Sequence, residues 1–410
     1  MTALTAFLIL AVGPHPAGPP ASSEPAGPVV TLETISQGNL TGALLGIAEG
    51  GMVLVGQASG LVARVPLEEV VELALRPPDR VPPAETAGTL FLATGGRVRG
   101  RITASDKTGV TFESSLWGRA TIAFDRLLAY LPPRPEAPPE KHKALVDELL
   151  AGTGKQDLVY LANGDRMPGV IEMLSPGQVI VSGALGRREY TGAEVTAIAF
   201  SRDHLQRRLP ETVYTVLTLA DGSVLAARIK SMSGGTFTLE ALAGFDLTLR
   251  AERLSRLQVR NGRVVWLSEV EPARVSYVPY YNRVWPMRRN LSVWGRPLTI
   301  RGQTFASGLG LASRTTLAYR LDGKFDRLEA QAGIDDETGG KGRATLTVIT
   351  DGRRAVNRAL TGGQPAAALN VPLADVKELL IIVDFGDDTD IGDHVDLGGA
   401  RLIRTKKPSE

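Results

Sequence analysis

The chain has 410 residues, of which 43% are hydrophobic and 22% charged, and its formal net charge is +2. This composition is that of a globular protein long enough for two or more domains, and the near-neutral charge gives no general attraction to nucleic acid or membranes. The chain has no cysteine, which excludes disulfide bonds and thiolate chemistry, and its four histidines are too widely spread in the sequence to favour a multi-histidine metal site.

The N-terminus carries an apolar run over residues 5–12, followed by a segment rich in Pro, Gly and Ala. The run has the length of a signal-peptide core and is shorter than the roughly 20 residues that a membrane-spanning helix needs. No basic residue precedes Arg64, so the positive charge usual before such a core is missing. We predict that residues 1–28 are a signal peptide and a disordered linker, that the protein is periplasmic or secreted, and that it has no stable membrane span. A buried or frayed apolar N-terminus is the alternative.

Four segments with the same order of short strands and glycine turns follow. They are residues 29–80, 86–132, 157–203 and 212–275. The first turn of each falls at Gly38, Gly96, Gly164 and Gly222, with spacings of 58, 68 and 58 residues. Such repetition indicates an array of one small unit. About five strands in each segment predict a strongly bent sheet that closes into a small SH3-like or Sm-like barrel, because closure removes exposed strand edges.

An extra segment, residues 133–156, lengthens the spacing between the second and third repeats. Its first half is rich in proline and predicts a linker. Its second half has apolar residues at helical spacing and ends at Gly152, which predicts one short helix around 140–150 that docks on a barrel. Trp117, in the second repeat, stands beside a turn glycine, and we interpret it as a packing residue rather than a sugar-stacking one.

A basic zone bridges the last repeat and the C-terminal region. Ten arginines fall between residues 253 and 301, with Tyr277, Tyr280, Tyr281 and Trp285 among them. Basic residues interleaved with aromatic ones are typical of nucleic-acid surfaces. A solvated face between domains is the more ordinary arrangement, and we predict that the protein has no nucleic-acid partner.

Region 283–405 contains short runs in which apolar and polar residues alternate, separated by Gly, Asp and Asn turns. In residues 316–321 and 327–334 the period is two, which places one face of each strand in a core. Leu379–Val383 is apolar throughout, which predicts a central strand covered on both faces. Asp351-Gly352 predicts a tight hairpin, because a type I′ turn needs positive φ at both central positions. About nine such strands predict a two-layer β-sandwich, and the chain as a whole is predicted to be all-β.

Four sequence blocks in this region resemble the NPCBM family of carbohydrate-binding modules. The blocks are RPLTIRGQTFASGLGLAS, YRLDGKFDRLEAQAGIDDE, VITDG and DFGDDTDIGDHVDLGGARL, in this order. The resemblance covers about residues 284–404. It implies a galactose-binding-like β-sandwich, or jelly roll, of a non-catalytic kind that is often attached to secreted glycosidases.

The positions that match the family's blocks imply a glycan-binding surface. They are Asp335, Asp336, Glu337, Asp393, His394, Asp396 and Arg401. Two positions differ from the family's pattern: Leu311 stands where a histidine is common, and Leu397 stands where a tryptophan is common. Each leucine removes a polar or aromatic ligand feature, although it packs readily in a sandwich. A hydrogen bond between His394 and a loop carboxylate is the alternative to a ligand contact by this histidine.

Six aspartates crowd into residues 384–396. Asp388, Asp390 and Asp393, with Gly392 to turn the loop, are typical of oxygen ligands, and we hypothesise a structural Ca²⁺ there. A solvated acidic loop is the alternative. Asp335 and Asp336 are close enough in sequence to be considered as the acid and nucleophile of a glycosidase. Neighbours on an extended chain point to opposite faces, however, and we predict that the chain is not an enzyme.

These observations predict an exported, non-enzymatic protein that binds a glycan or cell-surface polysaccharide through its sandwich. The barrels are expected to act as spacers or as docking units for protein partners. One alternative is a protein-interaction scaffold whose sandwich has lost its affinity for sugar. Another is a glycosidase accessory protein or a hydrolase.

Overall fold

The computed structural model describes residues 27–75, 87–133, 139–152, 154–184, 186–206, 209–279, 284–386 and 391–405. The described residues form a nearly all-β protein with one α-helix, which confirms the predicted fold class. None of the described helical residues belongs to a helix long and apolar enough to cross a membrane. Almost all of the predicted signal segment, residues 1–26, lies outside the described part of the chain.

Each of the four repeats forms five antiparallel strands. The first has β1 (Val29–Thr34), β2 (Gly38–Ile47), β3 (Met52–Gly56), β4 (Val62–Pro66) and β5 (Val70–Leu75). The second has β6 (Gly88–Leu92), β7 (Arg97–Ser105), β8 (Gly109–Ser114), β9 (Gly118–Ala123) and β10 (Leu127–Leu131). The third has β11 (Asp157–Leu161), β12 (Arg166–Leu174), β13 (Gln178–Gly183), β14 (Gly186–Thr191) and β15 (Val195–Ala199). The fourth has β16 (Tyr214–Leu219), β17 (Val224–Ser233), β18 (Thr236–Ala241), β19 (Phe245–Arg250) and β20 (Leu254–Arg260).

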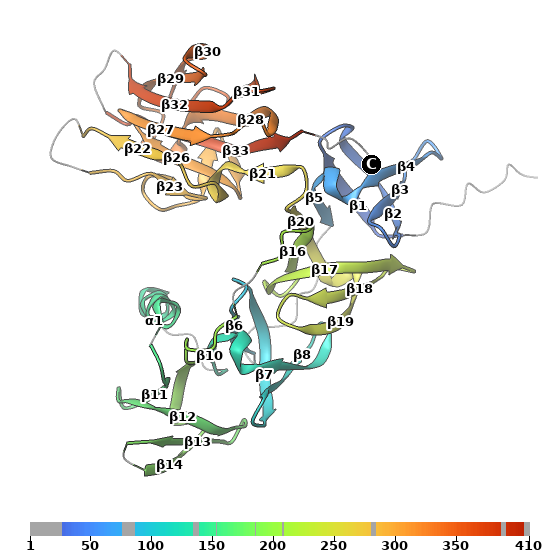
Figure 1. Cartoon of the computed structure of the whole chain (residues 1–410), viewed down its shortest axis with the longest axis vertical. Coiled ribbons are helices and arrows are strands. Elements are labelled where there is room, and N and C mark those ends of the chain that lie inside the picture. Colours follow the sequence, from blue (N-terminus) through green and yellow to red (C-terminus); the bar gives the residue numbers. More distant parts are fainter. Residues whose placement is uncertain are drawn as a thin grey trace, which may run out of the picture.

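The fifth strand of each unit pairs with its own first strand and also with the fifth strand of another unit. Strand β5 pairs with β20, with Leu73 opposite Leu257, and β10 pairs with β15, with Ala129 opposite Ala199. We expected closure of each sheet to remove its edges. Instead, the fifth strand of each unit pairs with another unit, so the backbone N–H and C=O groups along that edge form hydrogen bonds between units. In Figure 1 the units follow one another in the order first, fourth, second, third, and β17 of the fourth unit pairs with β7 of the second.

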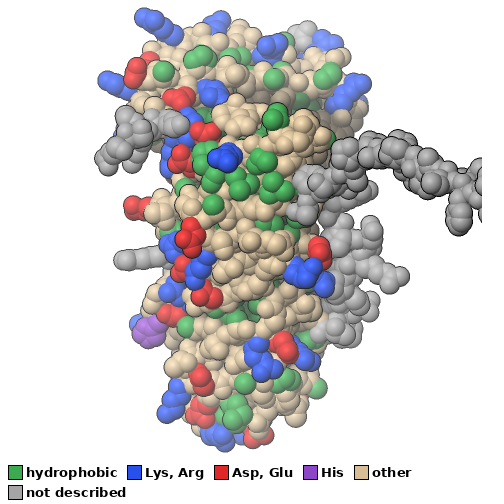
Figure 2. Space-filling model, turned by 90° about the vertical axis from the view of Figure 1, so that its right-hand side faces the viewer, with side chains coloured by type: hydrophobic (Ala, Val, Ile, Leu, Met, Phe, Trp, Pro, Cys, Tyr) green, Lys and Arg blue, Asp and Glu red, His purple; other side chains and the backbone are tan. Residues whose placement is uncertain are grey.

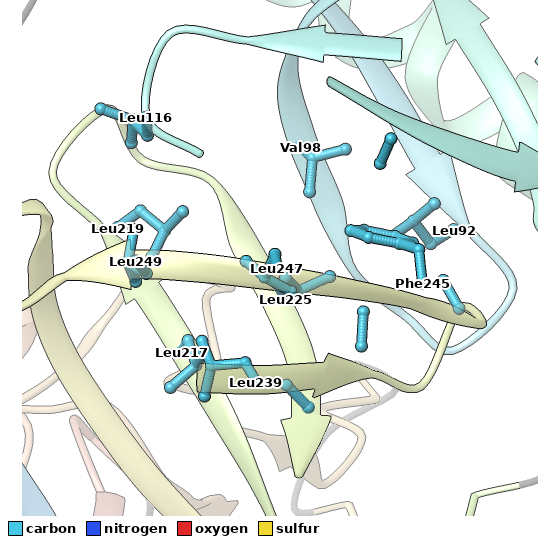
Figure 3. Packing of buried hydrophobic residues seen from close by; sticks show 14 of the residues in the cluster. Leu92, Val98, Leu116, Leu217, Leu219, Leu225, Leu239, Phe245, Leu247 and Leu249 are labelled. Carbon is cyan, nitrogen blue, oxygen red and sulfur yellow. The ribbon is translucent and has the colours of Figure 1, made fainter. Parts of the chain in front are cut away.

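The units share one hydrophobic core. Figure 3 shows side chains of the second unit, such as Leu92 and Val98, near those of the fourth, such as Leu225 and Phe245. Trp117 stacks on Phe112 of its own unit at 6.3 Å between ring centroids, and on Phe245 of the fourth unit at 6.5 Å. This tryptophan is therefore a packing residue, as predicted, and its contacts join two units.

Helix α1 (Pro139–Ala151) lies over the junction of β10 and β15. Its Leu149 is fully buried, and Leu145 and Val146 pack beside it on a cluster that includes Ala129 and Ala199. The short alanine side chains at the junction leave room for the helix to approach the paired strands. The helix thus covers the place where two units join.

The C-terminal sandwich consists of two antiparallel sheets and a short hairpin. The first sheet has β23 (Arg288–Arg289), β26 (Gly308–Ala312), β33 (His394–Arg404), β28 (Phe325–Ile334) and β31 (Ala367–Pro372), with β21 (Val264–Trp266) also pairing β33. The second has β22 (Arg274–Tyr277), β27 (Thr315–Arg320), β32 (Glu378–Phe385), β29 (Arg343–Thr350) and β30 (Arg353–Thr361). The hairpin has β24 (Leu298–Ile300) and β25 (Gln303–Phe305).

The sandwich begins earlier in the chain than the sequence indicated. We assigned residues 212–275 to the fourth barrel, but β21 and β22 pair with β33 and β27 of the sandwich. Strand β32 occupies the centre of its sheet, as expected, although Leu380 and Ile382 are only half-buried on its outer face. Asp351 and Gly352 have φ of 45° and 78°, as the predicted type I′ hairpin turn requires.

Glycines allow a third layer to lie on the first sheet. In β26 and β33, Leu309, Leu311 and Leu397 point into the core, so Gly308 and Gly310 lie on the outer face. Residues 290–305 cover that face, and Leu298 and Ile300 are buried beneath it. A Cβ atom on Gly310 would lie 2.4 Å from the backbone oxygen of Leu291. The close approach of this segment therefore requires glycine.

We expect Gly310→Ala to destabilise the protein, because the added methyl group would collide with backbone that a side-chain rotation cannot move. The expected loss is about 1–3 kcal/mol of unfolding free energy, measured by chemical denaturation. Gly177→Ala is the matched control, since no atom lies within 4 Å of its added Cβ. Equal stability of the two variants would contradict the close packing of residues 290–305 on β26.

Candidate functional site

Two tryptophans and a histidine form an aromatic surface at one end of β33. Trp285 and Trp294 stack with ring centroids 6.3 Å apart and an interplanar angle of 22°. His394 meets both indoles edge-on, at 5.1 Å from Trp285 and 5.5 Å from Trp294. Trp294 is 47% exposed, whereas His394 is buried. The cluster thus exposes the indole of Trp294 to solvent, while Trp285 and His394 pack against it.

A tight turn sets the direction of Trp294. The N–H of Ser292 donates to the carbonyl of Arg296, and the N–H of Gly295, where φ is +84°, donates to the carbonyl of Ser292. Within this turn Val293 is buried, and its carbonyl accepts from Nε of Arg288 at 2.8 Å. With Val293 held inward, the next side chain, Trp294, points outward.

A carboxylate and a guanidinium lie beside the tryptophan turn. Ser292 Oγ donates to Glu337 Oε1, and Arg296 Nε is 3.6 Å from Glu337 Oε2. The Glu337 side chain is 8% exposed and that of Arg296 is 69% exposed. Burial raises the pKa of Glu337 above its usual value. Of these groups, the Arg296 guanidinium is the one most available to a ligand.

Two buried carboxyl groups support the site from below. Asp335 directly follows β28 and Asp396 lies on β33, and both accept from the N–H of Thr299, at 3.4 and 2.9 Å. Burial, together with the neighbouring carboxylate of Asp335, raises the pKa of Asp396 to about 10. Two ionised carboxylates have only acceptors. Asp396 therefore keeps a proton at neutral pH and donates it toward Asp335.

The remaining predicted residues lie elsewhere. Asp336 accepts from the N–H groups of Arg301 and Gly302, at 2.8 and 2.7 Å, and so holds the turn of the β24–β25 hairpin. Asp393 is buried, and its Oδ1 accepts from the N–H of Arg343. Arg401 lies further along β33, beside the first barrel. The structure thus brings together Asp335, Glu337, His394 and Asp396, and it separates Arg401 from them.

The predicted calcium site falls mostly outside the described residues, because Asp388 and Asp390 are not among them. Within the described part of the chain no group of three or more His, Asp or Glu residues could hold a metal ion. The proposal of a structural Ca²⁺ bound by Asp388, Asp390 and Asp393 therefore stays a prediction.

The two positions that depart from the family's pattern both face the core. Leu311 is fully buried and Leu397 is 1% exposed, and both belong to the cluster between the two sheets. In this chain these positions contribute packing, as expected of leucine, and the aromatic surface is supplied by Trp285 and Trp294 instead. Sequence reasoning placed Trp285 in the basic zone and did not single out Trp294. A tryptophan next to a turn glycine does not distinguish it, because Trp117 has the same pattern and is a packing residue.

Several arginines of the basic zone form ion pairs. Arg260 pairs with Glu269 at 3.0 Å, and Arg289 pairs with Glu271 at 2.6 Å. Figure 2 shows acidic and basic side chains intermixed on the face that it presents. The ion pairs of Arg260 and Arg289 agree with the interpretation of the zone as a solvated face between domains.

The C-terminal region is similar to a known family of domains. Residues 263–403 match the family model of the NPCBM/NEW2 domain, which confirms the predicted resemblance. A protein of Renibacterium salmoninarum, named "Putative endo-alpha-N-acetylgalactosaminidase", is 32% identical over 84 residues, which are 20% of this chain. The match spans 6% of that relative's length.

Solved structures of similar proteins include carbohydrate-binding modules. The CBM51 module of a Clostridium perfringens protein, in complex with methyl-galactose, is 25% identical, with a TM-score of 0.31 over 34% of this chain and 99% of the module. The tandem CBM51 modules of a family 98 glycoside hydrolase from Streptococcus pneumoniae are 10% identical, with a TM-score of 0.31, over 92% of this chain and 88% of theirs.

Proposed function

We propose that this protein is an exported, non-catalytic glycan-binding protein whose binding surface is formed by Trp285, Trp294 and His394. The main observation behind the proposal is that the exposed indole of Trp294 stacks on Trp285 and contacts the ring of His394 edge-on. The C–H groups on one face of a pyranose ring pack against an indole face, and nearby polar groups fix the orientation of the ring. The NPCBM/NEW2 match at residues 263–403 supports the same proposal.

The surface is organised before a ligand arrives. The Trp294 ring has little freedom, because Trp285 stacks behind it and Val293 anchors its turn. A side chain that is already ordered loses less entropy when it binds. Arg296 extends beside the indole as a donor to sugar hydroxyl groups, since its guanidinium has several N–H groups and is mostly exposed.

Sugars of the galactose configuration are the first ligands to test. Their axial hydroxyl leaves a continuous set of C–H groups on one ring face, which suits an indole platform. The name of the Renibacterium salmoninarum relative also refers to N-acetylgalactosamine. We propose that the four barrels hold the sandwich as a spacer or docking unit, and that residues 1–28 direct export, which the N-terminal sequence of the mature protein would test.

A glycan array probed with the full chain tests this function. We expect binding to glycans that end in galactose or N-acetylgalactosamine, followed by titration calorimetry with the free sugar. A correctly folded protein that binds no glycan on the array would contradict the proposal. That result would favour the alternative of a protein-interaction scaffold whose sandwich has no affinity for sugar.

A further inference from the structure

A second concave site lies between the sandwich and the barrels. Its volume is about 630 Å³, within the range of small-ligand sites. It opens on the outer face of the first sheet, between the β24–β25 hairpin on one side and strands β1, β5 and β20 on the other. In Figure 1, β21 and the end of β33 lie where the sandwich adjoins the barrels. The cleft therefore exists only because the two parts are joined.

The floor of the cleft is set by the register of the first sheet. Asn370, Glu329, Arg401 and Trp266 are direct neighbours across β31, β28, β33 and β21, so their side chains share one face. The next row contains Gln331 opposite Gly398. A bulge separates the two rows, since three residues of β33 span the same distance as two residues of β28.

Phe305 forms an aromatic wall. A Cβ atom on Gly398 would lie 2.4 Å from the Phe305 ring, so the ring rests directly on this glycine of β33. The other side of the ring borders the cleft, and the side chain is only half-buried. The hairpin thus presents a second aromatic platform, and the lining of the cleft does not include Trp294.

The charged groups that line the cleft neutralise one another. Arg401 pairs with Glu33 of the first barrel at 2.5 Å and with Glu329 at 2.8 Å. Arg256 lies 3.3 Å from Glu72. Because these charges are already satisfied inside the protein, a charged ligand would have to break an existing ion pair to enter.

Four of the five amide side chains that line the cleft are available instead, since Gln258 donates to Glu72 at 3.0 Å. Asn39, Gln303, Gln331 and Asn370 make no side-chain hydrogen bond to any described residue. Each carboxamide has donors and an acceptor side by side, which matches adjacent hydroxyl groups of a sugar. We propose that this cleft is a second ligand site, which takes a short neutral oligosaccharide against Phe305 and the four amides. It is independent of the aromatic surface around Trp294, and it makes the first barrel part of a binding site.

The test uses the full chain carrying Trp294→Ala, so that the first surface no longer contributes. The probes are maltotriose, cellotriose, triacetylchitotriose and β-1,4-galactotriose, titrated by calorimetry. We expect at least one to bind, and its affinity to fall about tenfold when Asn370→Ala or Phe305→Ala is added, through the loss of one hydrogen-bonding or stacking contact.

Gln364→Ala is the matched control, because this glutamine is exposed and lies outside the cleft. It should leave the affinity unchanged, and melting curves establish that each variant is folded. Asn370 is exposed, so its replacement keeps the test valid if Phe305→Ala does not fold. The proposal is overturned if none of the four trisaccharides binds, or if binding is the same with and without the two cleft substitutions. Weaker binding of the glycan-array ligand by the Trp294→Ala chain bears on the first surface, whereas binding of the four trisaccharides by that same chain tests the cleft.

Discussion

Replacing Trp294 by alanine is expected to weaken glycan binding by about 5- to 150-fold, which is the effect of losing one aromatic stacking contact of about 1–3 kcal/mol. The protein should stay folded, because the side chain is half exposed and the turn is anchored by Val293 rather than by the indole. Titration calorimetry with the best glycan of the array measures the change.

Two further variants separate stacking from general surface effects. Trp294→Phe keeps an aromatic face and should recover most of the affinity. Leu61→Ala removes a side chain of the first barrel that is 67% exposed, and it should have no effect on binding. If Trp294→Ala binds as tightly as the native chain, the sugar site lies elsewhere on the protein.

The repeats and the sandwich were predictable because their signals are local. Alternation over six to ten residues identifies a strand and its buried face, and a pair such as Asp351-Gly352 identifies a turn. Strand β21 was missed because it has only three residues, and its partner β33 lies more than a hundred residues away. The pairing of β5 with β20 was missed because the two strands are far apart in the sequence, and neither sequence indicates which strand it pairs with.

The candidate site was predicted in part. Family resemblance led to His394, Asp335 and Asp396, which the structure does bring together. It also led to Arg401, whose partner Glu33 lies on the first barrel, so its role depends on a contact that a family pattern does not contain. Trp294 was not predicted as a site residue because a single tryptophan in a turn has no periodicity. Only the fold shows that it contacts Trp285 and His394.

Asp396→Asn is expected to make the protein less sensitive to alkaline pH. The pKa of Asp396 is about 10 in the folded protein and about 4 in an unfolded chain. Between these values the unfolded state loses a proton that the folded state keeps, so the free energy of unfolding falls as pH rises, by at most about 1.4 kcal/mol per unit. Asparagine does not titrate, and its amide can still donate to Asp335 and accept from Thr299.

The measurement is urea denaturation of both proteins at pH 5 and pH 8. Over this interval the native chain should lose up to about 4 kcal/mol more than the Asp396→Asn variant. Asp375→Asn is the control, because Asp375 is exposed and its φ of 60° suits asparagine equally well. It should keep the pH dependence of the native chain. If Asp396→Asn keeps that dependence as well, Asp396 is ionised in the folded protein, and the buried pair beneath the tryptophan surface must be held together by a donor other than its proton.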